Sequence, residues 1–182
     1  ASKIFNCKKS EILVSSTGVI GEKLNSLKII NKLNFINKSN SQSVLEAAKS
    51  IMTTDTYPKT FIINLKHNHY NFNIYGFAKG SGMVKPNMGT MLAYIFIDYY
   101  IPKKILNILL KKYLNSTFNS ISVDGDTSTS DTIMLFSTVL KSSKLKLNKS
   151  LLNKISNNLD LVMQNLSRQI VSDGEGISKL IE

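Results

Sequence analysis

Apolar residues along the chain follow two spacings, one typical of helices and the other of strands. Positions that recur every three or four residues predict helices with one buried side. Short apolar runs bounded by polar residues predict strands. The predicted helices are residues 23–36, 43–52, 102–113, 131–140 and 149–171. The predicted strands are residues 11–15, 60–65, 72–78, 90–98, 119–123 and 177–181. Because strands and helices alternate, the pattern predicts a layered α/β or α+β domain.

Polar and glycine-rich stretches separate these elements. Residues 66–71 (KHNHYN) predict a hairpin loop between two strands. Residues 79–89 (KGSGMVKPNMG) combine glycines with Pro86, a composition that favours a loop. Residues 124–131 (DGDTSTSD) predict a capped turn before a helix.

Composition limits the class of protein. With 182 residues, 42% hydrophobic and 19% charged, the chain is long and apolar enough to bury a core without cross-links. Its one cysteine, Cys7, excludes an internal disulfide and any metal site made of several cysteines. The longest apolar run, residues 91–97, is far shorter than the stretch of about 20 residues that spans a bilayer. Residues 1–11 lack the apolar core of a secretory signal. We therefore expect a cytoplasmic protein with no membrane partner.

The net charge of +11 raises the question of nucleic-acid binding. Only Arg168 among the 23 basic residues is an arginine, and the lysines are spread along the chain. Nucleic-acid-binding proteins tend to cluster their basic residues and use arginine for two-pronged contacts. We expect no nucleic-acid partner, although a noncatalytic basic binding module stays open as an alternative.

Three stretches match known sites only superficially. Around Gly80 and Gly82 the spacing fits neither a phosphate-binding loop nor a dinucleotide fingerprint. A calcium loop that starts at Asp124 would need glycine and glutamate where Thr129 and Leu135 stand. His67 and His69 have no third ligand nearby in the sequence. We predict no metal site.

Thr90 stands between the glycine-rich loop and a buried strand, a setting that suits an N-terminal nucleophile. A threonine hydroxyl is a weak nucleophile unless a base lies beside it. A free α-amine on the same residue, with a pKa of about 7.7–8.0, would provide that base. Forming the amine requires cleavage between Gly89 and Thr90. From the residues alone, a plain strand start is the favoured explanation of Thr90.

Five stretches, in this order, resemble the ornithine acetyltransferase family, the bifunctional glutamate N-acetyltransferases of arginine biosynthesis. They are LVSSTGVIGEKL (13–24), AAKSIMTTDTYPK (47–59), FAKGSGMVKPNMGTMLAYIFID (77–98), FNSISVDGDTSTSDT (118–132) and RQIVSDGEG (168–176). The resemblance implies a self-cleaving enzyme with the αββα sandwich of N-terminal nucleophile proteins. Members of the family are longer at both ends. We therefore expect an internal fragment whose fold is incomplete at both ends.

The resemblance implies specific roles around the cleavage point. Thr90 matches the nucleophile, and Thr17 and Gly18 match the oxyanion-hole pair. Cleavage between Gly89 and Thr90 would divide one structural domain into residues 1–89, part of an α chain, and residues 90–182, part of a β chain. Gly89 departs from the alanine usual at this position in the family.

The resemblance also implies substrate contacts and partners. Thr56, Lys79, Thr90 and Glu175 match substrate-binding positions. Lys79 suits a carboxylate, and Glu175 suits an ammonium group. The implied reaction moves an acetyl group from N-acetylornithine to glutamate through acetyl-threonine, giving ornithine and N-acetylglutamate.

The same resemblance implies that no cofactor takes part, although acetyl-CoA is a further candidate co-substrate. It also implies an assembly of two α and two β chains. A self-cleaving amidase or aminopeptidase of similar fold, in which water accepts the acyl group, remains the alternative.

Overall fold

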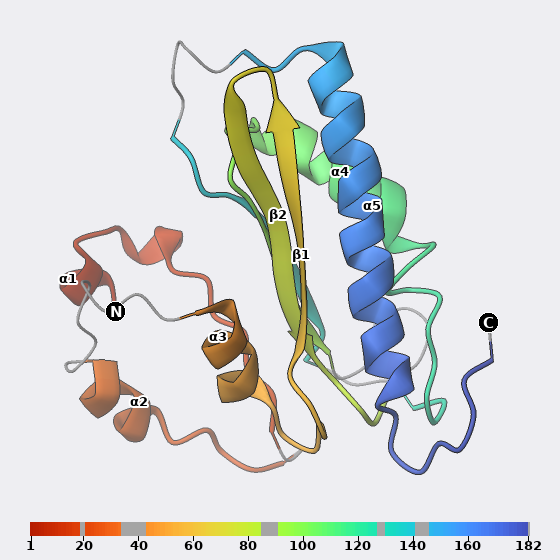
Figure 1. Cartoon of the computed structure of the whole chain (residues 1–182). Coiled ribbons are helices and arrows are strands. Elements are labelled where there is room, and N and C mark those ends of the chain that lie inside the picture. The colour runs from red at the N-terminus through yellow and green to blue at the C-terminus, as the bar shows by residue number, and fades with distance from the viewer. Residues whose placement is uncertain (19–20, 34–42, 85–90, 127–129, 141–145, 182) are drawn as a thin grey trace.

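A four-stranded sheet with helices on both sides organises the chain (Figure 1). This computed structural model describes residues 1–18, 21–33, 43–84, 91–126, 130–140 and 146–181. The elements follow in chain order: α1 (Ser2–Phe5), η1 (Lys9–Glu11), α2 (Ser26–Leu33), α3 (Val44–Ile51), β1 (Lys59–His67), β2 (Tyr70–Lys79), β3 (Leu92–Ile97), α4 (Lys103–Leu114), β4 (Thr132–Ser137) and α5 (Lys149–Ser172).

The strands lie in the order β1-β2-β3-β4, which is also their order in the sequence. β1 and β2 form an antiparallel hairpin whose turn contains Asn68 at a φ of 54°. β2 and β3 are antiparallel, with Lys79 opposite Leu92. β3 and β4 are parallel, with Leu92 opposite Thr132, and α4 lies in the connection between them. Lys79, Leu92 and Thr132 therefore form one row at an end of the sheet.

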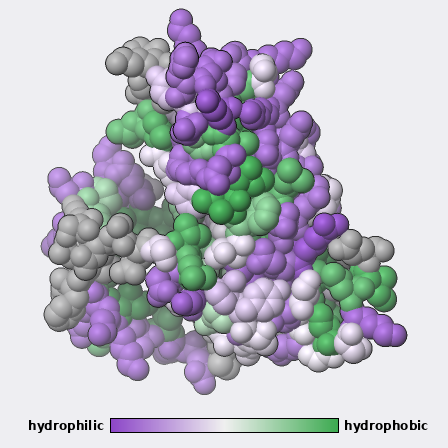
Figure 2. All heavy atoms as spheres, viewed as in Figure 1, coloured by the Kyte–Doolittle hydropathy of each residue, from purple (hydrophilic) through white to green (hydrophobic). Residues whose placement is uncertain are grey.

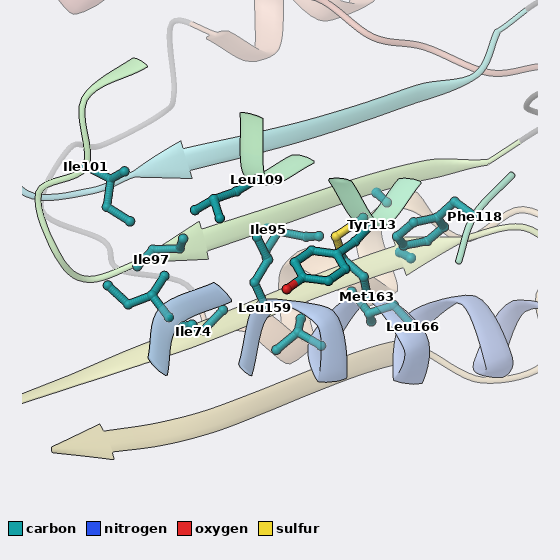
Figure 3. Packing of buried hydrophobic residues seen from close by; sticks show 14 of the residues in the cluster. Ile74, Ile95, Ile97, Ile101, Leu109, Tyr113, Phe118, Leu159, Met163 and Leu166 are labelled. Carbon is teal, nitrogen blue, oxygen red and sulfur yellow. The ribbon is translucent and has the colours of Figure 1, made fainter. Parts of the chain in front are cut away.

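The hydrophobic core lies between one face of the sheet and the helices α4 and α5 (Figure 3). Alternate residues of each strand point to this face, and residues of α5 spaced by three or four point back at it. The fully buried contributors include Ile74, Ile95, Ile97, Leu109, Tyr113, Leu159, Met163 and Leu166. Asn148 begins α5 by accepting a hydrogen bond from the N–H of Leu151 at 2.8 Å.

The opposite face of the sheet carries a row of aromatic rings. Tyr75 stacks on Phe96 and Phe96 on Phe136, with ring centroids 5.3 Å and 5.1 Å apart. Phe77 packs against Tyr94 at 5.1 Å. These rings are half-buried. α3 lies on this side of the sheet, as do α1 and α2 (Figure 1).

The layered α+β fold is confirmed, as are the helices α3, α4 and α5 and the strands β1, β2 and β3. The predicted helix 23–36 is observed as α2, and its last three positions lie outside the described residues. The second sheet of the implied αββα sandwich is not among the described residues, which form one sheet. That part of the fold stays a prediction.

The prediction of a helix over residues 131–140 was wrong, because this segment forms β4. A short apolar run such as TIMLF fits a buried helix or a buried strand equally well. Pairing with β3 decides between them, so the element that follows the predicted cap is a strand. Residues 127–129 of that predicted cap lie outside the described residues.

The predicted strands 11–15, 119–123 and 177–181 were also wrong, because none of them joins the sheet. The hydroxyl of Ser15 shares a hydrogen bond with that of Tyr94 on β3. Val123 donates one backbone hydrogen bond, 2.7 Å long, to Val84. Leu180 and Ile181 are exposed near the C-terminal end, where Figure 2 shows hydrophobic atoms at the surface. Isolated bonds of this kind do not build a strand ladder.

None of the helices in the described segments is both long enough and apolar enough to cross a bilayer.

Gly76 offers a test of the core between β2, β3 and α5. An added Cβ would lie 2.8 Å from the Tyr94 carbonyl oxygen and 2.9 Å from Leu166 Cδ1. We expect Gly76→Ala to lower the free energy of unfolding by about 1–3 kcal/mol, because overpacking forces the backbone apart. Gly18→Ala, where nothing lies within 4 Å, is the control for chemical denaturation. Equal stability of the two variants would contradict this packing.

Candidate active site

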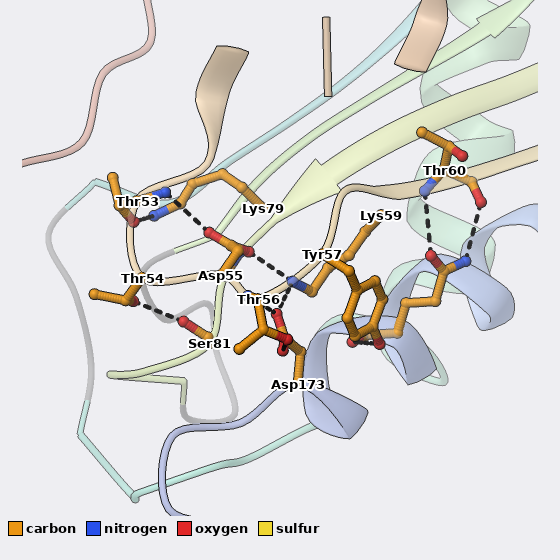
Figure 4. Close-up of polar contacts among 12 residues, drawn as sticks. Thr53, Thr54, Asp55, Thr56, Tyr57, Lys59, Thr60, Lys79, Ser81 and Asp173 are labelled. Carbon is orange, nitrogen blue, oxygen red and sulfur yellow. Dashed lines mark hydrogen bonds and ion pairs between the residues drawn. The ribbon is translucent and has the colours of Figure 1, made fainter. Parts of the chain in front are cut away.

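A buried lysine joins three segments at one end of the sheet (Figure 4). Lys59 Nζ lies 2.6 Å from Asp55 Oδ1 and 2.5 Å from Asp173 Oδ2. The side chains of Lys59 and Asp55 are fully buried, and that of Asp173 is 3% exposed. Lys59 also lies over the ring of Tyr57, 4.9 Å from its centroid. The network links the loop after α3, the first residue of β1 and the end of α5.

Asp55 organises the loop between α3 and β1. It accepts backbone hydrogen bonds from Gly80 at 2.7 Å and from Thr53 at 3.2 Å. Burial alone would raise the pKa of Asp55, but the hydrogen bonds from Gly80, Lys59 and Thr53 outweigh it, so the pKa is lowered. The carboxylate is therefore held in its charged form, next to the residue that follows Lys79.

Asp173 fixes the same loop from the end of α5. It accepts the backbone N–H of Thr56 at 2.9 Å and also the hydroxyl of Thr56. Burial would raise its pKa, and the bonds from Lys59 and Thr56 lower it overall. One turn earlier on α5, the side chain of Gln169 exchanges two hydrogen bonds of 3.1 Å with the backbone of Thr60. The end of α5 is thus bound to the start of β1.

Lys79 lies at the end of β2 and is 2% exposed. Its Nζ donates to Thr53 Oγ1 at 3.0 Å. Burial lowers the pKa of Lys79, and Lys59 adds to this effect, while the charges of Asp55, Asp131 and Glu175 oppose it. The contact of Lys79 with a substrate carboxylate stays a prediction.

Glu175 comes to the same place from the turn after α5. Its N–H donates to the Ser81 carbonyl oxygen at 2.6 Å. A Cβ on Gly82 would lie 3.0 Å from Glu175 Cδ, so the carboxylate rests directly over that glycine. Glu175 itself is exposed. The structure therefore brings the predicted cationic and anionic substrate contacts together although 96 positions separate them in the sequence.

The predicted oxyanion-hole residues lie on the segment that contacts β3 through Ser15 and Tyr94. Thr17 is half-buried and Gly18 is exposed, with open space around it. The Thr17 hydroxyl makes no hydrogen bond with another described residue. Tyr94 shares a face of the sheet with Lys79, because Tyr94 is two residues from Leu92, the partner of Lys79. The role of this pair stays a prediction.

Two predicted residues, Gly89 and Thr90, lie outside the described residues. The first described residue after them is Met91, which is 1% exposed. The N–H of Met91 donates to Asp131 Oδ1 at 2.9 Å, and its carbonyl oxygen accepts the N–H of Thr132 at 3.0 Å. The chain that follows Thr90 is therefore firmly held at the end of the sheet where Lys79 lies.

Comparison with known proteins places these residues in a family. The model of the ArgJ family matches residues 1–182. The chain belongs to the ArgJ family. It is 40% identical to the arginine biosynthesis bifunctional protein ArgJ of Bradyrhizobium diazoefficiens and 42% identical to the glutamate N-acetyltransferase of Methanocaldococcus jannaschii. Each match covers 100% of this chain, but 46% and 45% of those two relatives. The chain thus spans about half the length of the curated ArgJ proteins it matches.

Sequence reasoning missed the residues that support this candidate site. Asp55, Lys59 and Asp173 lie inside the matching stretches, but TTDTYPK gives no sign that its charged residues are buried. The contact of Thr56 with Asp173 was also missed. The contact of Thr56 with substrate stays a prediction. A separate pocket beside the second half of α5 is lined by none of the predicted residues.

The ion pairs of Lys59 generate a stability prediction. Lys59→Met leaves Asp55 and Asp173 buried without their cation, so we expect a loss of about 3–5 kcal/mol in the free energy of unfolding. Lys49→Met is the matched control, because Lys49 forms a half-exposed pair with Glu46. For the control we expect a change of at most about 1 kcal/mol in urea titrations.

The same residues predict an acid dependence. In the folded protein Asp55 and Asp173 have pKa values below the ordinary 3.8. As the pH falls, these carboxylates are therefore protonated in the unfolded chain before they are protonated in the folded one. The stability they contribute is present above pH 3.8 and is lost as the pH falls below it. Urea titrations across this range should show a steeper loss for the wild type than for Lys59→Met. If the free energy of unfolding fell equally steeply with pH in both proteins, the assignment of this acid dependence to Asp55 and Asp173 would be contradicted.

Proposed function

We propose that the full-length protein transfers the acetyl group of N-acetylornithine to glutamate. The observation that carries this proposal is the meeting of Lys79 and Glu175 at the end of the sheet where β3 begins, two residues after Thr90. Membership of the ArgJ family and the names of the relatives support it. A buried lysine and an exposed carboxylate fit substrates that carry both a carboxylate and an ammonium group.

In the proposed reaction, Thr90 is the nucleophile and its own α-amine is the base. Thr90 Oγ attacks the acetyl carbonyl, and its proton passes through the amine to the departing nitrogen of ornithine. The N–H of Gly18 and the hydroxyl of Thr17 would donate to the oxyanion. Glutamate then attacks acetyl-Thr90, which forms N-acetylglutamate and restores the Thr90 hydroxyl. Lys79 binds a substrate carboxylate, and Glu175 binds a substrate ammonium group.

Formation of the amine requires cleavage between Gly89 and Thr90. Attack of Thr90 Oγ on the carbonyl of Gly89 would give an ester, which water then opens. The products would be an α chain that contains residues 1–89 and a β chain that contains residues 90–182. By resemblance to the family, we also propose an assembly of two α and two β chains in the cytoplasm.

The proposal predicts both the products and the processing. With N-acetylornithine, the full-length enzyme should release ornithine only when glutamate is present, as read by chromatography of both amino acids. Intact-mass measurement should show two chains for the wild type. For Thr90→Ala it should show one uncut chain with no acetyl transfer, because this variant lacks the nucleophile.

Each departure from this result has a distinct meaning. Release of ornithine without glutamate would indicate a hydrolase in place of a transferase. An uncut wild type that still transfers acetyl groups would rule out the N-terminal nucleophile. Acetyl-CoA is tested as a second donor in the same assay.

Lys79 and Glu175 predict a loss of substrate binding with processing preserved. A hydrogen bond to a charged group contributes about 1.5–3 kcal/mol, so we expect Lys79→Met and Glu175→Gln to raise KM by about 10-fold or more. Lys66→Met, at an exposed lysine of β1, is the control and should leave KM unchanged. If either site variant blocks chain cleavage, that residue acts in maturation, and its assignment to substrate binding is wrong.

A further inference from the structure

Gly82 is a glycine that its own backbone conformation does not require. Gly80, two residues earlier, has a φ of 149°, which side chains disfavour, but the φ of Gly82 lies outside that region. The missing side chain of Gly82 therefore provides space, and the carboxylate of Glu175 occupies it. A Cβ added to Gly82 would lie 3.0 Å from Glu175 Cδ and 3.1 Å from each of its carboxylate oxygens.

The backbone on both sides of this contact is fixed. The carbonyl oxygen of Ser81 accepts the N–H of Glu175 at 2.6 Å. Ser81 is 2% exposed, and its hydroxyl shares a hydrogen bond of 2.7 Å with that of Thr54 (Figure 4). The N–H of Gly80 is held by Asp55 at 2.7 Å. With these backbone positions set, the surface of Gly82 decides where the Glu175 carboxylate can rest.

Glu175 and Lys79 act on each other without joining. The charge of Glu175 raises the pKa of Lys79, although burial lowers that pKa overall. The two side chains are both described, and they form no ion pair with each other. Opposite charges arranged in this way leave room for a substrate that carries both a carboxylate and an ammonium group.

We propose that Gly82 is a specificity-determining residue, because it places the Glu175 carboxylate where that group selects the side-chain ammonium of N-acetylornithine. This inference rests on the proposed function and names the substrate that Glu175 recognises. N-acetylornithine has one free ammonium group, at the end of its side chain. Glutamate carries a carboxylate at the end of its side chain, which the charge of Glu175 repels. The contact therefore strengthens binding of the acetyl donor and not of the acceptor.

The test replaces Gly82 with alanine in the full-length protein. The added methyl group displaces the carboxylate, and the end of a flexible, exposed side chain moves at little cost in stability. Glu175→Asp is the second variant, because it draws the carboxylate back from Gly82 without changing the glycine. Ser50→Ala, at an exposed serine of α3, is the control.

A double-mutant cycle shows whether Gly82 acts through Glu175. Glu175→Ala removes the group that the added methyl displaces, so Gly82→Ala should have no further effect in that background. Thermal melting and intact-mass measurement show whether each variant is folded and cleaved.

Two readouts separate the substrates. Because acetyl transfer proceeds in two halves, kcat/KM for N-acetylornithine reports the first half and kcat/KM for glutamate the second. Calorimetric titration with ornithine, which has the same side-chain ammonium group, gives a Kd that needs no turnover.

We expect Gly82→Ala to lower kcat/KM for N-acetylornithine and to raise the Kd of ornithine by about 5-fold or more, because a hydrogen bond to a charged group is weakened. For glutamate, kcat/KM should stay unchanged or rise. Glu175→Asp should show the same difference between the substrates, and Ser50→Ala should match the wild type.

Equal losses with the two substrates would overturn the proposal, since a merely structural role of Gly82 affects both halves of the reaction. A loss that persists in the Glu175→Ala background would also overturn it, as would a wild type that does not bind ornithine. If the wild type binds ornithine but transfers no acetyl group, the proposed function fails, and the ornithine titrations still decide the role of Gly82.

Discussion

The ammonium group of Lys59, fully removed from water between Asp55 and Asp173, is the interaction on which this end of the molecule depends. A cation buried without partners would be strongly unfavourable, so the two carboxylates must be in place whenever the chain is folded. Each carboxylate is tied in turn to backbone N–H groups, Asp55 to Gly80 and Asp173 to Thr56. One side chain thus fixes the start of β1 and the ends of β2 and α5 relative to one another.

The proposed substrate contacts are direct neighbours of this network. Lys79 precedes Gly80, whose N–H is held by Asp55, and Glu175 follows Asp173 by two residues. A site held by rigid elements keeps its charged groups at a defined separation even when one of them is exposed. The network therefore acts as support for recognition, although none of its charged atoms needs to touch a ligand. The stacked rings from Tyr75 to Phe136 lie on the sheet face that also carries Lys79.

The sequence predicted those elements whose pattern is local. The spacing of apolar residues predicted α5. The sequence also predicted the hairpin of β1 and β2, but its turn is residues 68–69, because the pairs Lys66–Asn71 and His67–Tyr70 extend the ladder into the predicted loop. β4 was missed because its strand character depends on β3, from which α4 separates it. The positions of Lys79 and Glu175 followed from family resemblance, and no spacing in the sequence predicts that they meet. The burial of Lys59 was beyond sequence reasoning, because its partner Asp173 stands 114 positions away.

The order of strands in the sheet has a consequence for a chain cut before Thr90. β1 and β2 would then belong to one product, and β3, β4 and both core helices to the other. The β2–β3 ladder, the packing of α5 on the hairpin and the ion pair of Lys59 with Asp173 would all become contacts between separate polypeptides. Neither residues 1–89 nor residues 90–182 contain all the elements that form the described core. The two chains would be obligate folding partners, and the cut would have to follow folding, because it would otherwise release two halves that must find each other in solution.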